Sequence, residues 1–251
     1  MIEMERDELR DELLTLSENL TGEDLDYAID YLEVERKRMK GKSHNNSVVS
    51  FVGDYCEFGP GRVYLLMAIA RSKNNPLSSS EELCFREVVR SRGDVRRKYA
   101  KLKAIMVSPL ENGRTYDFYL YLSANARNVL KAHFNFRGKM DRWIRNRLNG
   151  ADNHEKFKKL GKYWLSELSK PSSRDETNLL IDVDDDSDSR LCEVKNALAD
   201  RTEVLAERKT PNGWHLVTNP FNHERLSIGL DIKTDGLLFL EHVNGGGRYG
   251  R

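Results

Sequence analysis

Several features that would place a protein outside the cell or in a membrane are missing from these 251 residues. Cysteine is scarce: Cys56, Cys84 and Cys192 are scattered and lack CxxC spacing, so neither a disulfide framework nor a zinc knuckle is supported. No segment approaches 18 apolar residues in a row, and the first residues are acidic where a signal peptide would be basic. We therefore expect a cytoplasmic protein that does not enter a membrane.

The motifs of common nucleotide-dependent and hydrolytic enzymes are missing as well. The sequence has no Walker-A loop, no GxGxxG after a strand, and no Ser or Cys nucleophile elbow. ATPase, dehydrogenase and hydrolase functions therefore have no support. What is present is a polar composition that can still fold, with 39% apolar and 32% charged residues.

The net charge of +1 conceals a separation of charge along the chain. Residues 1–35 hold thirteen Asp and Glu against two Lys and Arg, whereas residues 86–170 hold 21 Lys and Arg against eight Asp and Glu. The basic region is either a solvated helical surface or the electrostatic footprint of a polyanion. We expect it to contact DNA or RNA.

Hydrophobic periodicity and turn residues predict an α+β protein with four parts. Residues 1–47 are expected to form an acidic helical hairpin and a linker, and this hairpin is a candidate surface for a protein partner. A basic, mixed α/β region is expected at 48–170, followed by a palm-like sheet unit at 171–243 with a candidate metal site. The glycine-rich tail at 244–251 is expected to be disordered.

The basic region is predicted to contain a short β-rich stretch at 115–125 and a long helix at 126–150, with Asn125 as its cap. Another helix is expected directly after Ser80. Four apolar side chains of the long helix are expected to face the core: Phe134, Phe136, Trp143 and Leu148. Five arginines are left for solvent or phosphate and are the candidate nucleic-acid contacts: Arg127, Arg137, Arg142, Arg145 and Arg147.

From residue 179 onward the pattern is typical of strands. Strands are expected at 179–185, 203–210, 213–218 and 231–243, with a helix at 189–200 after the first strand. This β-α-β-β-β order is that of a compact palm-like, RRM-like half-domain.

A group of polar residues interrupts these apolar strands. Asp182 and Asp184 lie two positions apart at a strand end, so their carboxylates project to one face. A divalent cation, Mg²⁺ or Mn²⁺, would offset their repulsion, although a polar strand end that leads into a helix would also explain them. His215 and Asp235 lie on later strands, and if the strands are neighbours the four side chains converge. Two lysines would lie nearby as phosphate partners: Lys209 and Lys233.

Three short segments resemble the motifs of the archaeo-eukaryotic primase and primase-polymerase superfamily. They are IDVD at 181–184, NGWH at 212–215 and KTD at 233–235. The family's small residue two positions before the histidine is matched by Gly213. The chain departs from the family pattern in the interval of only twenty residues between His215 and Asp235.

The resemblance implies a nucleotidyltransferase that adds nucleotides to a nucleic-acid strand by two-metal chemistry. It makes Asp182, Asp184 and Asp235 the catalytic ligands of Mg²⁺ or Mn²⁺. It also makes His215 a contact to the phosphates of the incoming nucleoside triphosphate. The sequence does not specify whether the strand is DNA or RNA, or whether synthesis needs a primer.

Three other functions remain open at this point. A metal-dependent nuclease would use Asp184 with Glu207 and Lys209, provided that these residues point to the face that carries the aspartates. A covalent nucleotidyl ligase would use Lys233 of KTDG as its nucleophile, although only eighteen residues follow this lysine. A non-catalytic nucleic-acid-binding protein would use the basic region alone.

Overall fold

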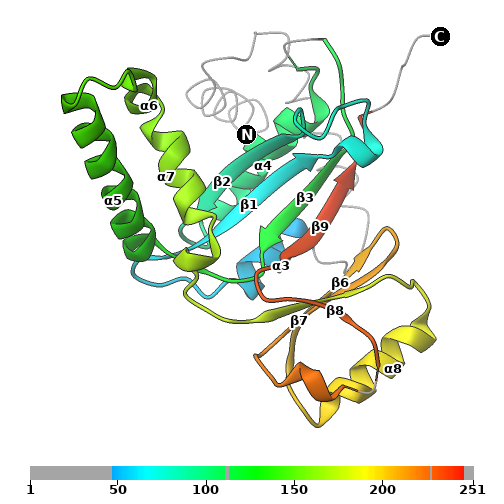
Figure 1. Ribbon diagram of the computed structural model, residues 1–251. Helices are drawn as coiled ribbons and strands as arrows, with labels where there is room; N and C mark the ends of the chain where they lie inside the picture. Colours follow the sequence, from blue (N-terminus) through cyan, green and yellow to red (C-terminus); the bar gives the residue numbers. More distant parts are fainter. Residues whose placement is uncertain (1–46, 111–112, 227, 246–251) are drawn as a thin grey trace.

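The computed structural model describes residues 47–110, 113–226 and 228–245. The expected acidic hairpin and nearly all of the expected glycine-rich tail lie outside these residues. The described part is α+β, as the sequence predicts, with two antiparallel sheets and helices packed against them (Figure 1).

The larger sheet has the strand order β2-β1-β3-β9, and the smaller sheet has the order β6-β7-β5-β8. The strands of the larger sheet are β1 (Arg62–Ala70), β2 (Leu83–Val89), β3 (Phe118–Ser123) and β9 (Leu237–Val243), with the short β4 (Arg127–Asn128) paired to β1. Those of the smaller sheet are β5 (Leu179–Val183), β6 (Val204–Thr210), β7 (Gly213–Thr218) and β8 (Asp231–Lys233).

The helices of the described residues are α3 (Val48–Tyr55), α4 (Asp94–Val107), α5 (Val129–Leu148), α6 (His154–Lys158), α7 (Leu160–Leu168) and α8 (Asp188–Ala199). Short 3-10 turns lie at Ser72–Asn74, Pro171–Ser173 and His223–Arg225. No helix within the described residues is long and apolar enough to cross a membrane.

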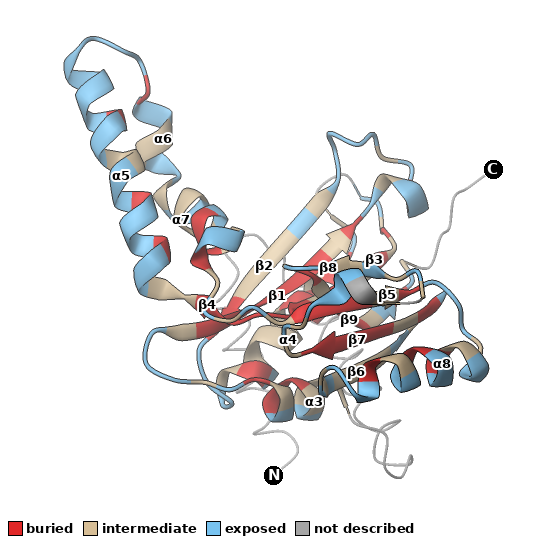
Figure 2. Ribbon diagram, turned by 60° about the horizontal axis from the view of Figure 1, so that its bottom comes forward, coloured by how far each residue is buried: buried red, intermediate tan, exposed pale blue. Residues whose placement is uncertain are grey.

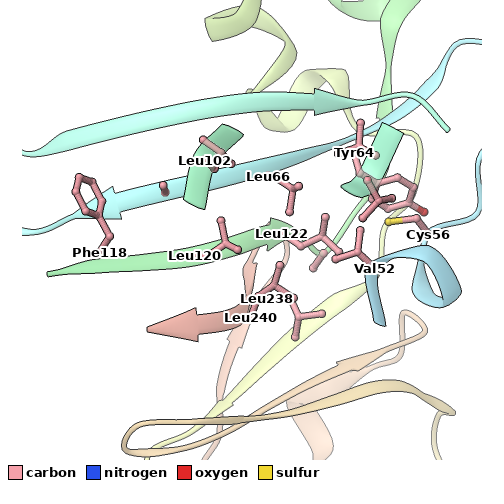
Figure 3. Packing of buried hydrophobic residues seen from close by; sticks show 14 of the residues in the cluster. Val52, Cys56, Tyr64, Leu66, Leu102, Phe118, Leu120, Leu122, Leu238 and Leu240 are labelled. Carbon is pink, nitrogen blue, oxygen red and sulfur yellow. The ribbon is translucent and has the colours of Figure 1, made fainter. Parts of the chain in front are cut away.

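The main core lies between the larger sheet and helices α3 and α4. Leu66, Leu120 and Leu122 project from the central strands toward these helices, and Leu238 joins them from β9 (Figure 3). Leu180 and Val217 of the smaller sheet belong to the same cluster, so one apolar core joins the two sheets. Burial of this continuous apolar area is the main force that holds the sheets together.

Helix α8 covers the other face of the smaller sheet. Ile181 and Val183 of β5 pack there against Val194 and Leu198 of the helix. Since side chains alternate along a strand, the residues between them, including Asp182, face the opposite way. This alternation places the candidate site on the face that is turned toward the larger sheet.

Helices α5, α6 and α7 form an arm that projects from the larger sheet (Figure 2). The long helix predicted at 126–150 is confirmed as α5, but Asn128 caps it by accepting the N–H of Lys131. The prediction that Asn125 caps this helix is wrong. The buried side chain of Asn125 instead accepts the N–H of Asn178 and donates to the carbonyl of that residue.

Two of the four expected core residues of α5 are also wrong. Phe136 and Trp143 are buried between the helices of the arm, whereas Phe134 and Leu148 are 68% and 81% exposed. A helix in a projecting arm packs on one side only, so part of its apolar surface faces solvent.

Two further segments differ from expectation. The segment after Ser80, predicted to be helical, forms strand β2, which pairs along seven residues with β1; helix α4 begins only at Asp94. The strand predicted at 231–243 is divided into β8 and β9, which belong to different sheets. The chain turns at Thr234 and Asp235, and Gly236 permits a close approach to Leu180.

The predicted succession of strand, helix and two strands from residue 179 is confirmed as β5, α8, β6 and β7. The likeness of this unit to an RRM-like palm stays a prediction.

Candidate functional site

Asp182 and His215 form the centre of the candidate site. They are direct partners across the antiparallel pair β5 and β7, which places both side chains on the same face. Nε2 of His215 lies 3.3 Å from Oδ1 of Asp182. The sequence therefore predicted correctly that Asp182 and His215 meet, because the strands that carry them are neighbours in the sheet and place them directly opposite each other.

His215 is also bonded to the larger sheet. Its Nδ1 accepts the backbone N–H of Phe239 in β9 at 3.0 Å, and only 8% of the residue is exposed. An Nδ1 that accepts cannot carry a proton, so the neutral ring has its proton on Nε2 and donates it to Asp182. The imidazole is held in one orientation from two sides.

Lys233 completes the charge balance around Asp182. Its Nζ lies 2.6 Å from Oδ2 of Asp182 and 3.1 Å from Oδ2 of Asp231. The hydrogen bond from His215 lowers the pKa of Asp182, and burial raises it. Together with the bond from Lys233, the net effect is a pKa of about 2. Burial lowers the pKa of Lys233, but hydrogen bonds to the two aspartates outweigh it and raise this pKa overall. Asp182 is therefore a permanent anion at neutral pH.

Asp184 lies one residue beyond β5 and is exposed. The next residue, Asp185, accepts the N–H of Ser187 and so shapes the turn that leads into α8. The acidic run after β5 therefore has two roles: Asp184 is accessible from solvent, and Asp185 stabilises the turn.

Asp235 does not join Asp182. It lies in the turn between β8 and β9, where Arg127 donates to both of its carboxylate oxygens at 2.8 and 3.0 Å. Strand β8 ends at Lys233, which pairs with Leu180, so Asp235 lies beyond the part of β8 that is paired with β5. The expected convergence of Asp235 with Asp182 and His215 is wrong, because the chain turns toward Arg127.

Arg127 was expected to face solvent or phosphate, and this expectation is wrong. It lies in β4 and is only 1% exposed, and its NH1 group also donates to the carbonyl of Lys170 at 3.2 Å. The fully buried Arg127 needs an anionic partner, and the partly buried Asp235 supplies one from 108 residues away. The sequence signal was Asp235 itself, a charged residue within an apolar run, but nothing in its neighbourhood indicated which arginine it binds.

Lys209 lies on the opposite face from Asp182, so its expected place beside the phosphates is wrong. It pairs in register with Trp214 and lies 5.1 Å above the indole ring. Glu207, on the same side of β6, forms an ion pair with Lys195 of α8. The nuclease alternative required both residues to share a face with Asp182, and this arrangement is not formed.

The other four candidate arginines are exposed on α5, as expected: Arg137, Arg142, Arg145 and Arg147. The arm at residues 129–170 holds eleven Lys and Arg against four Asp and Glu. Burial raises the pKa of Glu167, but hydrogen bonds from Lys139 and Lys170 outweigh it and lower this pKa. The remaining cations give the arm a positive surface.

The donor set fits one divalent cation better than two. Within the described residues no three His, Cys, Asp or Glu side chains are grouped so as to hold a metal ion. Asp182 and Asp184 supply carboxylates at alternate positions, and Mg²⁺ often needs only one or two carboxylates when substrate phosphates complete its shell. A second ion that relies on Asp235 does not fit, because the buried Arg127 occupies both oxygens of that residue. Both oxygens of Asp182 are occupied as well, by His215 and Lys233, so a cation at Asp182 would have to displace the more exposed Lys233.

Comparison of the chain with protein-family models, with curated proteins and with solved structures found no match. The functional argument therefore depends on the chemistry of the site itself.

Proposed function

We propose that the chain is a primase-polymerase-like nucleotidyltransferase whose nucleotide-phosphate site is centred on Asp182 and His215. The pairing of these two side chains on one sheet face, at 3.3 Å, carries the proposal. An ionised carboxylate, a fixed N–H donor and a lysine within one hydrogen-bonded group are the elements that recognise a metal-bound triphosphate.

Each residue has a definite role in this proposal. Asp182 and Asp184 would hold Mg²⁺ or Mn²⁺, which, when bound, neutralises phosphate charge and polarises the reacting oxygens. His215 and Lys233 donate to Asp182 in the free protein. When the carboxylate binds a cation, the exposed Lys233 would turn to a phosphate oxygen, and the fixed N–H of His215 would donate to a phosphate oxygen placed beside Asp182. Asp235 acts as a positioning residue, because its ion pair with Arg127 fixes the turn that follows Lys233.

The test is nucleotide incorporation with Mg²⁺ or Mn²⁺ on DNA and RNA templates, with and without a primer. We expect Asp182→Asn to abolish incorporation and Asp184→Asn to lower it strongly, whereas Asp200→Asn, an exposed acid at the end of α8, should have no effect. His215→Ala should mainly raise the KM for nucleotide. An activity that persists in Asp182→Asn would refute the role of this site.

A non-catalytic nucleic-acid-binding protein is the second candidate, and one observation favours it. Lys233 already neutralises Asp182, and Arg127 already neutralises Asp235, so both acids are stable without a metal. Measuring the Mn²⁺ affinity of Lys233→Met distinguishes the nucleotidyltransferase from the non-catalytic binding protein. If Asp182 is a metal ligand, removal of the competing cation should raise the affinity for Mn²⁺ several-fold, with Lys195→Met as the control on the opposite face. Absence of Mn²⁺ binding and of incorporation under all conditions would favour the second candidate.

A further inference from the structure

The second face of the larger sheet is only partly covered by helices. Helices α3 and α4 pack against the first face, and α7 packs over β1 on the second (Figure 1). Met67 and Ile69 of β1, which pack toward α7, are paired in register with Tyr121 and Tyr119 of β3. The two tyrosines therefore lie on this second face, beside the part that α7 covers.

Aromatic side chains follow this face from β3 to β9. Tyr119 stacks on the exposed His242 with ring centroids 4.5 Å apart and an angle of 20° between the planes. Tyr121 meets Phe239 edge to face at 6.0 Å, and the guanidinium of Arg71 lies 5.5 Å above its ring. Both tyrosines are partly exposed, and Arg71 is exposed.

The aromatic residues lead toward the candidate site. Burial raises the pKa of Tyr121, and Arg71, Asp182 and Lys233 all act on this phenol through their charges. Phe239 contributes its ring to the same group and its backbone N–H to His215. One end of this aromatic surface is therefore next to the nucleotide-phosphate site.

Ordinary packing of half-buried strand residues does not account for the arrangement as a whole. Packing explains Phe239, which is 8% exposed, but it does not require an exposed histidine stacked on a tyrosine or an arginine above an aromatic ring. Aromatic rings at alternate positions of a strand, with cations beside them, are the arrangement with which open sheets stack the bases of unpaired nucleic acid. Duplex bases are already stacked and would not reach these rings.

We propose that Tyr119, Tyr121, His242 and Arg71 form a stacking surface for single-stranded nucleic acid that guides unpaired nucleotides to Asp182 and His215. This inference deepens the proposed function and rests on it for the role of the strand, although binding can be measured without catalysis. Bases would stack on Tyr121 and on the Tyr119 and His242 pair, while Arg71 and the basic arm contact the phosphates.

The test is the binding of a fluorescent oligothymidylate in EDTA, without nucleotide. We expect Tyr121→Leu to lower the affinity about tenfold and Tyr119→Leu with Tyr121→Leu to lower it about 30-fold or more. Tyr121→Phe, which keeps the ring, should stay within about twofold of the wild type. Phe221→Leu, at an aromatic residue packed on the α8 side of the smaller sheet, is the matched control.

Two further measurements locate the bound strand. Photo-cross-linking with a 5-iodouracil oligonucleotide should give adducts on Tyr119, Tyr121 or His242. Arg71→Gln should reduce the dependence of affinity on salt by about 0.7 in the log–log slope, whereas Tyr121→Leu should leave that slope unchanged. A blunt duplex should compete poorly.

The outcomes separate this inference from the proposed function. Three outcomes would each overturn the stacking surface. The first is an oligonucleotide affinity that is unchanged in the double leucine variant, and the second is cross-linked adducts found only on residues outside this surface. The third is binding of mononucleotides, but not of the oligonucleotide, to this surface. If the leucine variants lose binding but no form of the protein incorporates nucleotides, the stacking surface stands and the proposed catalysis fails.

Discussion

Asp182 contributes to stability as well as to the candidate site. A metal site alone would lead us to expect that Asp182→Asn relieves repulsion among acids and keeps or raises stability. The contacts of Asp182 reverse that expectation, because His215 and Lys233 both donate to its carboxylate. We predict that the substitution lowers the free energy of unfolding by about 2 kcal/mol at pH 7.

This stabilisation has a defined pH range. The pKa of Asp182 is lowered from 3.8 to about 2 in the folded protein, so its contribution is complete above about pH 5 and is lost as the pH falls through about 2. Urea unfolding of wild type and Asp182→Asn should therefore give curves that differ at pH 7 and approach each other near pH 2.5. A difference that does not change with pH would contradict this assignment.

The pair of Arg127 and Asp235 gives a second prediction at this scale. Breaking a buried ion pair leaves one uncompensated charge, so Arg127→Met and Asp235→Leu should each cost about 3–5 kcal/mol. The double variant should cost much less than the two single changes together, because no charge is left behind. Urea unfolding of the wild type, the two single variants and the double variant measures this coupling. The exposed pair Lys158 and Glu155 is the control, with an expected coupling of about 0.5 kcal/mol or less.

Among the elements, α5 is the one whose charge should matter most for binding. We predict that changing Arg142, Arg145 and Arg147 to Ala weakens single-stranded nucleic-acid binding and reduces the log–log salt slope by about 2, since each lost phosphate contact removes about 0.7. The measurement is the affinity for single-stranded nucleic acid between about 50 and 200 mM salt, because contacts to phosphate weaken strongly over about that range. Alanine at three cations in and after α8, Arg190, Lys195 and Arg201, is the control. An unchanged slope would show that α5 is only a solvated surface.

Local sequence patterns were sufficient to predict most helices and strands. They failed where contacts between residues far apart in the sequence determine the structure. Alternating and apolar runs predicted β3, β5, β6 and β7, because their periodicity matches the faces that they bury. Strand β2 was missed, since its polar residues Arg86 and Glu87 resemble a helix surface until the pairing with β1 is known. The division between β8 and β9 was missed because both halves are strands, and only their pairing, β8 with β5 and β9 with β3, shows the change of sheet.

At the scale of the whole molecule, polar contacts join the smaller sheet to the strands of the larger one. His215 binds the N–H of Phe239, Arg208 donates to the carbonyl of Leu240 at 2.7 Å, and Asp235 binds Arg127. In the sequence, His215 and Asp235 looked like members of one metal site. The three-dimensional structure shows that these two residues bind separate parts of the larger sheet. A sequence pattern cannot show this, because it does not indicate which strands lie side by side.

The shared core and these polar contacts predict that the two sheets unfold together. Trp164 lies against the larger sheet and Trp214 lies on the smaller one. Variants that keep only one of these two tryptophans, and in which Trp143 of the arm is also replaced, should give the same urea midpoint by fluorescence and by circular dichroism, after allowance for the substitutions. Separate midpoints for the two reporters would show that the smaller sheet is an independent unit.

Gly213 has a consequence for how relatives of this chain should be recognised. A Cβ atom at this position would clash with the carbonyl oxygen of Val183 and crowd the backbone of Asp185. The small residue two positions before the histidine is therefore required by the close passage of β7 beside the end of β5, whether or not the site is active. In evolutionary terms, selection for folding alone would keep this glycine, whereas it would leave the exposed Asp184 free to change. Under the proposed function, the acid, and not the glycine, is therefore the residue whose retention would mark chains that keep the activity.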